Sequence, residues 1–161
     1  GPESIFQAIT ELHADRIGHG YFLFEKSKIT DKKITDKDKY IKNLCDYIAD
    51  RRITIEICLT SNLQTNPSVK DIKNHTFKKM IAHKLCTTFC TDNRTVSKTS
   101  VTKEVLIALE NFEFDIKTLK DCIIYGFKRS FFPESYSEKR VYVRQCLNYF
   151  DKLIKEYPGL I

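Results

Sequence analysis

The sequence predicts an α/β fold in which parallel strands alternate with helices. Three short runs with the composition of strands, at residues 16–20, 52–59 and 85–91, are separated by segments with helical periodicity. This order is typical of parallel strands that are joined by crossover helices. By periodicity alone it fits either a small doubly wound sheet or part of a barrel.

Each predicted strand ends in polar residues. The first ends at His19, which stands between two glycines, and the second ends in the Thr-Ser-Asn of residues 60–62. The third passes directly into Asp92 and Asn93, and a polar loop follows. Because α/β proteins keep their chemistry just beyond the carboxyl ends of their strands, we expect a functional site at these positions. On the residues alone, an ordinary turn after each strand remains the alternative.

Apolar stripes at helical spacing account for most of the remaining chain. The predicted helices cover residues 4–12, residues 40–50, a segment from about 69 or 71 to 83, and three final segments striped from Val101 to Phe112, from Ile116 to Phe127 and from Val143 to Tyr157. We expect Asp115 to cap the second of these final helices. Residues 21–39 contain the repeat Lys-Ile-Thr-Asp-Lys twice. We expect them to form an extended, solvated loop, with a lid over the site as the alternative.

The polar strand ends also resemble the motifs of a known family. Residues 16–20 (Arg-Ile-Gly-His-Gly), 56–62 (Glu-Ile-Cys-Leu-Thr-Ser-Asn), 91–93 (Thr-Asp-Asn) and 130–133 (Ser-Phe-Phe-Pro) are similar, in the same order, to blocks of the adenosine deaminase family. The resemblance runs through most of the chain. It implies an α/β fold that is the C-terminal part of a (β/α)8 TIM barrel, with these strands as the sixth, seventh and eighth. Residues 1–161 are then expected to be a C-terminal fragment of one such barrel domain, because a complete barrel takes about 250 residues.

The resemblance assigns roles to three side chains. Asp92 matches the family's aspartate ligand of a catalytic zinc ion, whose bound water is deprotonated near neutral pH. His19 matches the catalytic histidine beside that water, where an imidazole can accept a proton or an imidazolium can stabilise the adduct. Asn93 stands where many family members carry a second aspartate that contacts N7 of the purine. An amide donates a hydrogen bond to N7 directly, so the substitution is compatible with purine binding.

Supporting roles are expected for the neighbours of these residues. Gly18 and Gly20 allow the backbone to approach a ligand closely. Ser61 and Asn62 can hold the site through hydrogen bonds, although a strand-ending turn explains them equally well. The remaining histidines, His13, His75 and His83, match no ligand position of the motifs. We expect all three to be structural or exposed, with the last two on or beside a surface helix.

Two family blocks are absent from this sequence. Neither His-x-His nor His-Ala-Gly-Glu occurs in it, although in the family they supply the other zinc ligands and the proton-donating glutamate. Residues 1–5 resemble the family sequence that follows the second block, so we expect a longer protein. The implied function is zinc-dependent hydrolytic deamination of adenosine by that protein, with the N-terminal half of the barrel required and these 161 residues inactive alone. A deaminase of free adenine, or a non-catalytic half-barrel that oligomerises or binds a partner, are the alternatives.

The composition of the chain indicates which classes of partner and which cellular compartment to expect. The net charge of +6 comes from 27 basic and 21 acidic residues that are spread along the chain. This pattern is typical of a solvated surface rather than of a nucleic-acid site, and no platform of aromatic and basic residues is visible. No apolar run approaches the roughly 20 residues that span a bilayer. The six cysteines form no tight framework and predict free, mostly buried thiols in a reducing cytoplasm, although a zinc pair at Cys86 and Cys90 is a weak alternative.

Overall fold

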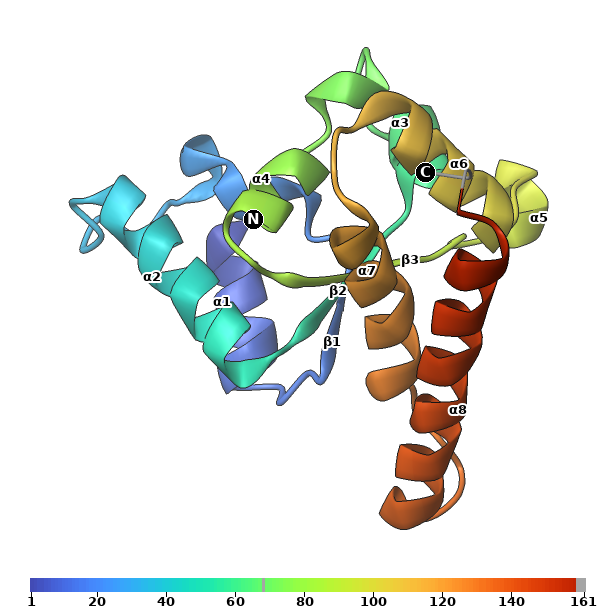
Figure 1. Ribbon diagram of the computed structural model, residues 1–161. Coiled ribbons are helices and arrows are strands. Elements are labelled where there is room, and N and C mark those ends of the chain that lie inside the picture. The colour runs from blue at the N-terminus through green and yellow to red at the C-terminus, as the bar shows by residue number, and fades with distance from the viewer. Residues whose placement is uncertain (68, 159–161) are drawn as a thin grey trace.

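Three parallel strands form the centre of the structure, a computed structural model that describes residues 1–67 and 69–158. The strands are β1 (Arg16–Gly18), β2 (Thr54–Ile57) and β3 (Cys86–Phe89), and the sheet has the order β1-β2-β3 (Figure 1). Ile17 pairs with Ile55, and Ile55 pairs with Thr87, so neighbouring strands are in continuous parallel register. The prediction of parallel strands with crossover helices is confirmed.

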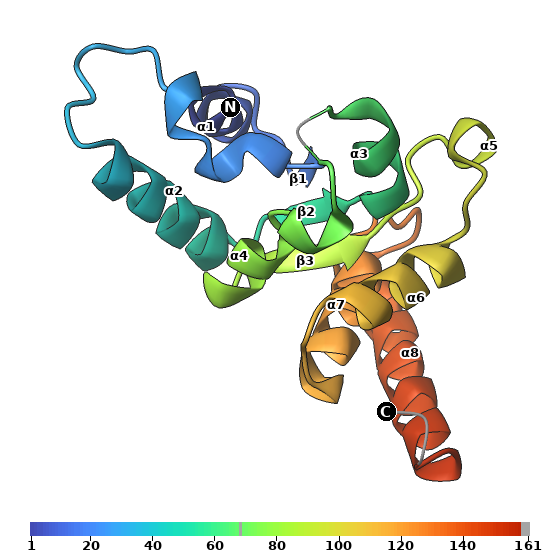
Figure 2. The same ribbon diagram turned by 90° about the horizontal axis from the view of Figure 1, so that it is seen from above.

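Helices surround the sheet on both sides. Figure 2 shows α1 and α2 on one side of the strands and α6, α7 and α8 on the other. The α-helices are α1 (Pro2–Thr10), α2 (Lys37–Arg51), α3 (Leu59–Thr65), α4 (Phe77–Ala82), α5 (Arg94–Ser97), α6 (Val101–Asn111), α7 (Ile116–Lys128) and α8 (Tyr136–Glu156). Three short 3-10 helices are η1 (Tyr21–Phe24), η2 (Lys26–Lys28) and η3 (Ile72–Asn74). None of the helices in the described ranges is both long enough and apolar enough to cross a membrane.

The core lies between the sheet and its helices. Ile55 and Ile57 of β2 are fully buried, as are Phe77 and Met80 of α4. Phe77 also meets three other aromatic rings edge-on, those of Phe89, Phe112 and Phe114. Such contacts stabilise a core beyond the burial of area alone, and they tie α4 to β3 and to the α6–α7 connection.

The α7 helix packs closely on β3. A Cβ atom at Gly126 would approach Thr88 Oγ1 to 2.7 Å, so only glycine allows this separation. Cys122 Sγ lies 3.3 Å from Thr87 Oγ1 in the same interface. At the start of α7 the Asp115 side chain accepts a hydrogen bond from Thr118 N at 2.8 Å, so the predicted cap is confirmed. This packing fixes the orientation of β3, whose end carries Asp92.

Two segments differ from the sequence-based expectation. Residues 21–39 are not a simple solvated loop, because they contain η1 and η2 and bury Leu23 and Ile29 in the core. Glu3 of α1 accepts hydrogen bonds from Thr30 N and Asp31 N, which fastens the first copy of the repeat. The predicted single helix before β3 is two pieces, η3 and α4, and it is interrupted at His75.

Candidate active site

A cavity of about 520 Å³ opens at the carboxyl ends of the strands. This volume lies in the range that small-molecule sites occupy. Six of the seven predicted site residues line the cavity: Gly18, His19, Gly20, Ser61, Asn62 and Asp92. The sequence also gave no indication of several other lining residues, which include Tyr21, Phe22 and Thr65. The ends of all three strands therefore contribute to one site.

His19 and Asp92 share an unusual backbone conformation. Their φ angles are 61° and 54°, in the left-handed region that few residues other than glycine adopt. His19 N itself donates to Glu56 O, and Asp92 lies two residues after Cys90, whose N donates to Ile57 O. A left-handed residue costs free energy that the surrounding structure must supply, and such residues concentrate at functional sites.

The side chains of His19 and Asp92 face each other across the cavity. His19 Nε2 lies 3.7 Å from Asp92 Oδ2, too far for a direct hydrogen bond. The two side chains are 39% and 42% exposed, so both remain open to the cavity. An oxygen atom placed between their open sides can contact both groups.

Ser61 holds the Asp92 carboxylate. Its hydroxyl donates to Asp92 Oδ2 at 2.7 Å, and the side chain is almost fully buried. The sequence placed residues 60–62 at the end of a strand, and this was wrong. The strand stops at Ile57, Cys58 is the N-terminal cap of α3, and Ser61 and Asn62 lie within that helix. The helix presents both side chains to the cavity from fixed positions.

A chain of hydrogen bonds orients the ring of His19. Phe77 N–H donates to His75 Nδ1 at 3.0 Å, so His75 carries its proton on Nε2 when the ring is neutral. That Nε2–H donates to Asn62 Oδ1 at 3.0 Å, which leaves the amide nitrogen of Asn62 facing His19 Nδ1 at 3.1 Å. His19 Nδ1 is then the acceptor, and neutral His19 holds its proton on Nε2, toward Asp92.

His75 is the site residue that the sequence missed. Its side chain is only 2% exposed and lies just before α4, so of the two expected alternatives, structural or exposed, the structural one holds. Burial, together with the smaller effect of the nearby His19, lowers the pKa of His75 to about 4. A neutral ring is what the donated bond from Phe77 N requires. A His two residues before a buried aromatic residue was the only signal in the sequence.

The two glycines have different reasons for their presence. Gly20 has a φ of 56°, and a Cβ atom there would come within 2.8 Å of the Ile55 side chain, so it is required by both conformation and space. A Cβ atom at Gly18 would meet nothing within 4 Å. Gly18 therefore borders the open cavity.

Asn93 does not line the cavity. Its Oδ1 accepts a hydrogen bond from Val96 N at 3.1 Å and caps the short helix α5. The cap uses the carbonyl oxygen of the amide, so the Nδ2 group is the part of this side chain that can donate elsewhere.

Glu104 connects two segments of the site through hydrogen bonds. It is fully buried on α6 and accepts from Thr60 N at 3.0 Å, from the Thr60 hydroxyl and from Thr99 Oγ1 at 2.6 Å. Thr60 precedes Ser61 on α3, and Thr99 ends the loop that follows Asp92. The glutamate thus ties together the two segments that carry Ser61 and Asp92.

The side chains that line the cavity can supply one ligand to a metal ion but not the complete set of ligands that a metal site needs. Within residues 1–67 and 69–158, no group of three or more His, Cys, Asp or Glu side chains is arranged to hold a metal. Asp92 is the carboxylate that lines the cavity, and the hydroxyl of Ser61 already orients it. The six cysteines are free, and Cys86 is buried within β3 while Cys90 lies beyond its end. Burial raises the pKa of Cys45 to about 12, which keeps that thiol protonated.

Two solved structures share the fold of nearly the whole chain. An amidohydrolase from Burkholderia ambifaria with bound zinc superposes with a TM-score of 0.74 at 23% identity and covers 98% of this chain and 39% of its own. An adenine deaminase from Arthrobacter aurescens superposes with a TM-score of 0.70 at 20% identity, over 96% of this chain and 41% of its own. The fold is therefore part of a TIM barrel.

The chain belongs to the adenosine deaminase family. The family model described as adenosine deaminase matches residues 1–143. Adenosine deaminase from Clostridium acetobutylicum is 36% identical over 134 residues, which are 83% of this chain and 35% of the relative. Adenosine deaminase from Salmonella typhi is 34% identical over 140 residues, which are 87% of this chain and 37% of the relative. The chain thus spans little more than a third of the length of these relatives.

Proposed function

We propose that this chain is the C-terminal part of a zinc-dependent hydrolase that converts adenosine to inosine and ammonia. The observation that carries the proposal is the pairing of His19 and Asp92. Both are left-handed residues at strand ends, and their side chains face each other at 3.7 Å across a cavity of ligand size. The curated relatives that match most of this chain are adenosine deaminases.

Asp92 is proposed as a zinc ligand. A carboxylate oxygen binds zinc at about 2.0–2.2 Å, and its partners in the family are imidazoles from outside this chain. The hydroxyl of Ser61 fixes one carboxylate oxygen, so the carboxylate is oriented before any metal arrives. When bound, zinc supplies hydroxide at neutral pH.

His19 is proposed as the residue that positions the attacking oxygen. The chain from Phe77 N through His75 and Asn62 leaves the His19 proton on Nε2, on the side of Asp92. That N–H donates to an oxygen placed between the two side chains and stabilises negative charge on it. Proton acceptance at Nε2 would first require the proton to leave, so the geometry favours donation at the start of the reaction.

Asn93 is proposed to contact the purine. Its amide group is held by the cap bond to Val96 N, which leaves Nδ2 available to donate to a ring nitrogen. Gly18 leaves room for substrate beside His19, and Asn62 holds the His19 ring in place. Free, buried cysteines favour a reducing compartment, and we place the protein in the cytoplasm.

The proposal makes these 161 residues inactive alone, since a catalytic zinc takes about three ligands from protein and Asp92 supplies one. The test restores the missing part of the barrel, either from the gene's own upstream sequence or from the Clostridium acetobutylicum relative. The restored and the isolated chains are loaded with zinc and assayed for loss of adenosine absorbance, with free adenine in parallel.

We expect turnover of adenosine by the restored chain and none by the isolated one. A restored, folded chain that binds zinc and acts on neither compound would contradict the proposal. If the restored chain deaminates adenine but not adenosine, the proposed substrate is wrong and the proposed reaction, a hydrolytic deamination, still holds. The unmodified relative serves as the positive control.

A further inference from the structure

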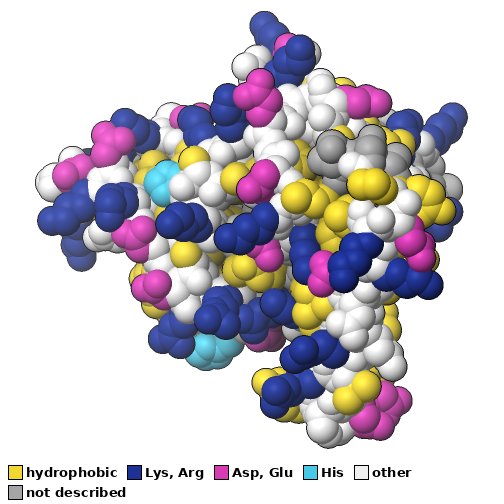
Figure 3. Space-filling model, viewed as in Figure 1, with side chains coloured by type: hydrophobic (Ala, Val, Ile, Leu, Met, Phe, Trp, Pro, Cys, Tyr) yellow, Lys and Arg dark blue, Asp and Glu magenta, His cyan; other side chains and the backbone are white. Residues whose placement is uncertain are grey.

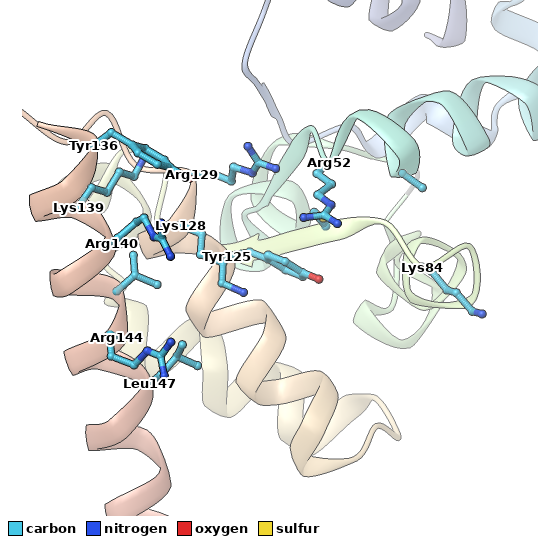
Figure 4. Close-up of a pocket in the computed structure, with 13 residues that line it drawn as sticks. Arg52, Lys84, Tyr125, Lys128, Arg129, Tyr136, Lys139, Arg140, Arg144 and Leu147 are labelled. Carbon is cyan, nitrogen blue, oxygen red and sulfur yellow. The ribbon is translucent and has the colours of Figure 1, made fainter.

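A second cavity lies at the opposite end of the strands. Its volume is about 690 Å³, and it is bounded by the ends of α2 and α7, by the start of β3 and by one face of α8 (Figure 4). Arg52 and Lys84 precede β2 and β3, whereas His19 and Asp92 follow β1 and β3. The cavity is therefore separate from the candidate active site.

Basic side chains dominate the lining of this cavity. Seven of its 13 lining residues are Lys or Arg, and none is Asp or Glu: Arg52, Lys84, Lys128, Arg129, Lys139, Arg140 and Arg144. Figure 4 shows Arg140 and Arg144 pointing from α8 toward Lys128, and Arg52 pointing toward Tyr125, while Lys84 stands at the far rim. Four separate segments of the chain thus place basic residues around one hollow.

These cations have no carboxylate partners in the described part of the chain. The ion pairs there involve other basic residues, such as Arg16 with Glu56 and Lys120 with Asp151. Lys139 donates to Ser130 O, and Lys128 lies over the ring of Tyr125, but neither contact neutralises a charge. Much of the face drawn in Figure 3 mixes both signs of charge. Like charges around a shared hollow repel one another, and a bound anion relieves that repulsion.

The geometry suits an anion with several charged groups. Arg140 and Arg144 are four residues apart and so project from the same face of α8, beside the apolar Val143 and Leu147. Arginine binds phosphate oxygens through two parallel N–H groups, and lysine adds a point charge. The volume exceeds what one inorganic phosphate fills, and Tyr125 and Tyr136 provide aromatic surface at the margin.

We propose that this cavity binds a small phosphorylated molecule that carries at least two phosphate groups. A nucleoside polyphosphate and an inorganic polyphosphate share this chemistry. The two tyrosines favour the nucleotide, because a ring can lie against them while the phosphates meet the arginines.

The test uses tripolyphosphate, ATP and adenosine as probes of the 161-residue chain, by calorimetric titration at about 150 mM salt. The variant Arg140→Gln/Arg144→Gln removes two cavity charges on an exposed helix face, where glutamine keeps good helix propensity. Its matched control, Lys32→Gln/Lys33→Gln, removes two charges from the exposed repeat. A second variant, Arg52→Gln, acts from a different element, and circular dichroism verifies the fold of each.

We expect saturable binding of tripolyphosphate and ATP at one site, weakened about tenfold or more by either cavity variant and less than about twofold by the control. Tighter binding of ATP than of tripolyphosphate identifies the nucleotide, and equal binding identifies the inorganic anion. The proposal is overturned by an absence of saturable binding or by an equal loss in the control. It also fails if Asp92→Ala abolishes binding, or if an oligoglutamate peptide binds more tightly than either phosphate probe.

Discussion

The two ends of the same three strands carry opposite kinds of polar surface. At the carboxyl ends, Asp92, Ser61, Asn62 and His75 satisfy one another or a neighbour through hydrogen bonds. At the amino ends, seven cations surround a cavity whose lining includes no carboxylate. A preorganised network suits the positioning of reacting atoms, whereas uncompensated charge suits the capture of an anion.

Loss of His19 is expected to have the largest effect at the carboxyl ends. In the restored chain, His19→Asn should lower kcat for adenosine by about 10²- to 10⁴-fold, since it removes the donor that faces the attacking oxygen. The measurement is the steady-state rate with zinc present. His83→Asn is the matched control, because His83 is exposed and does not line the cavity, and its rate should stay unchanged. Equal losses of kcat in His19→Asn and His83→Asn would contradict the proposed role of His19.

Glu104 should be the main stabiliser of that network. Glu104→Ala leaves Thr60 N and two hydroxyl groups without their acceptor, so the free energy of unfolding should fall by about 3–4 kcal/mol. Urea unfolding measures it. Glu110→Ala, an exposed change on the same helix, should cost less than about 0.5 kcal/mol. A small effect of Glu104→Ala would mean that the two segments are held by other contacts.

The pH dependence of the free energy of unfolding should reflect the protonation of His75. Its pKa in the fold is about 4, below the ordinary value of 6.5. Between these pH values the unfolded chain binds a proton that the fold excludes, so stability falls as the pH drops from 6.5 toward 4. The change amounts to about 3 kcal/mol. Unfolding midpoints across this range should lose most of that slope in His75→Gln and keep it in His83→Gln. An unchanged slope in His75→Gln would contradict the buried, neutral ring.

A smaller effect is expected from Ser61. Ser61→Ala removes the donor to Asp92 Oδ2 but no ligand, so zinc affinity or activity of the restored chain should fall by about 10- to 100-fold. Zinc titration with a competing chelator measures the affinity. Thr10→Ala, whose hydroxyl bonds a backbone oxygen of its own helix but which does not line the cavity, is the control. If Ser61→Ala lowers zinc affinity and activity no more than the control does, Ser61 has no role in orienting Asp92.

Local sequence predicted the carboxyl ends well. Strand composition followed at once by His19 or Asp92 identified positions that the structure brings into one cavity. The resemblance supplied their proposed chemistry, which the geometry alone does not test. His75 escaped notice because its importance depends on burial and on bonds to Asn62 and Phe77 N, which no local pattern encodes.

The amino ends were less predictable for a related reason. Their basic residues come from positions between 52 and 144, and in sequence they look like an ordinary dispersed surface charge. Only the packing of α8 against α7 brings them together. The boundary error at residues 60–62 has a local cause, since Leu59 continues the apolar strand pattern although Cys58 already caps a helix.

The most direct test of the central claim is the zinc content and adenosine turnover of the restored chain with and without Asp92. The proposal predicts that the unmodified chain binds one zinc ion and deaminates adenosine, and that Asp92→Ala remains folded but loses both properties. Full zinc binding and full turnover in Asp92→Ala would contradict the account, because the residue on which the site is built would then contribute nothing to it.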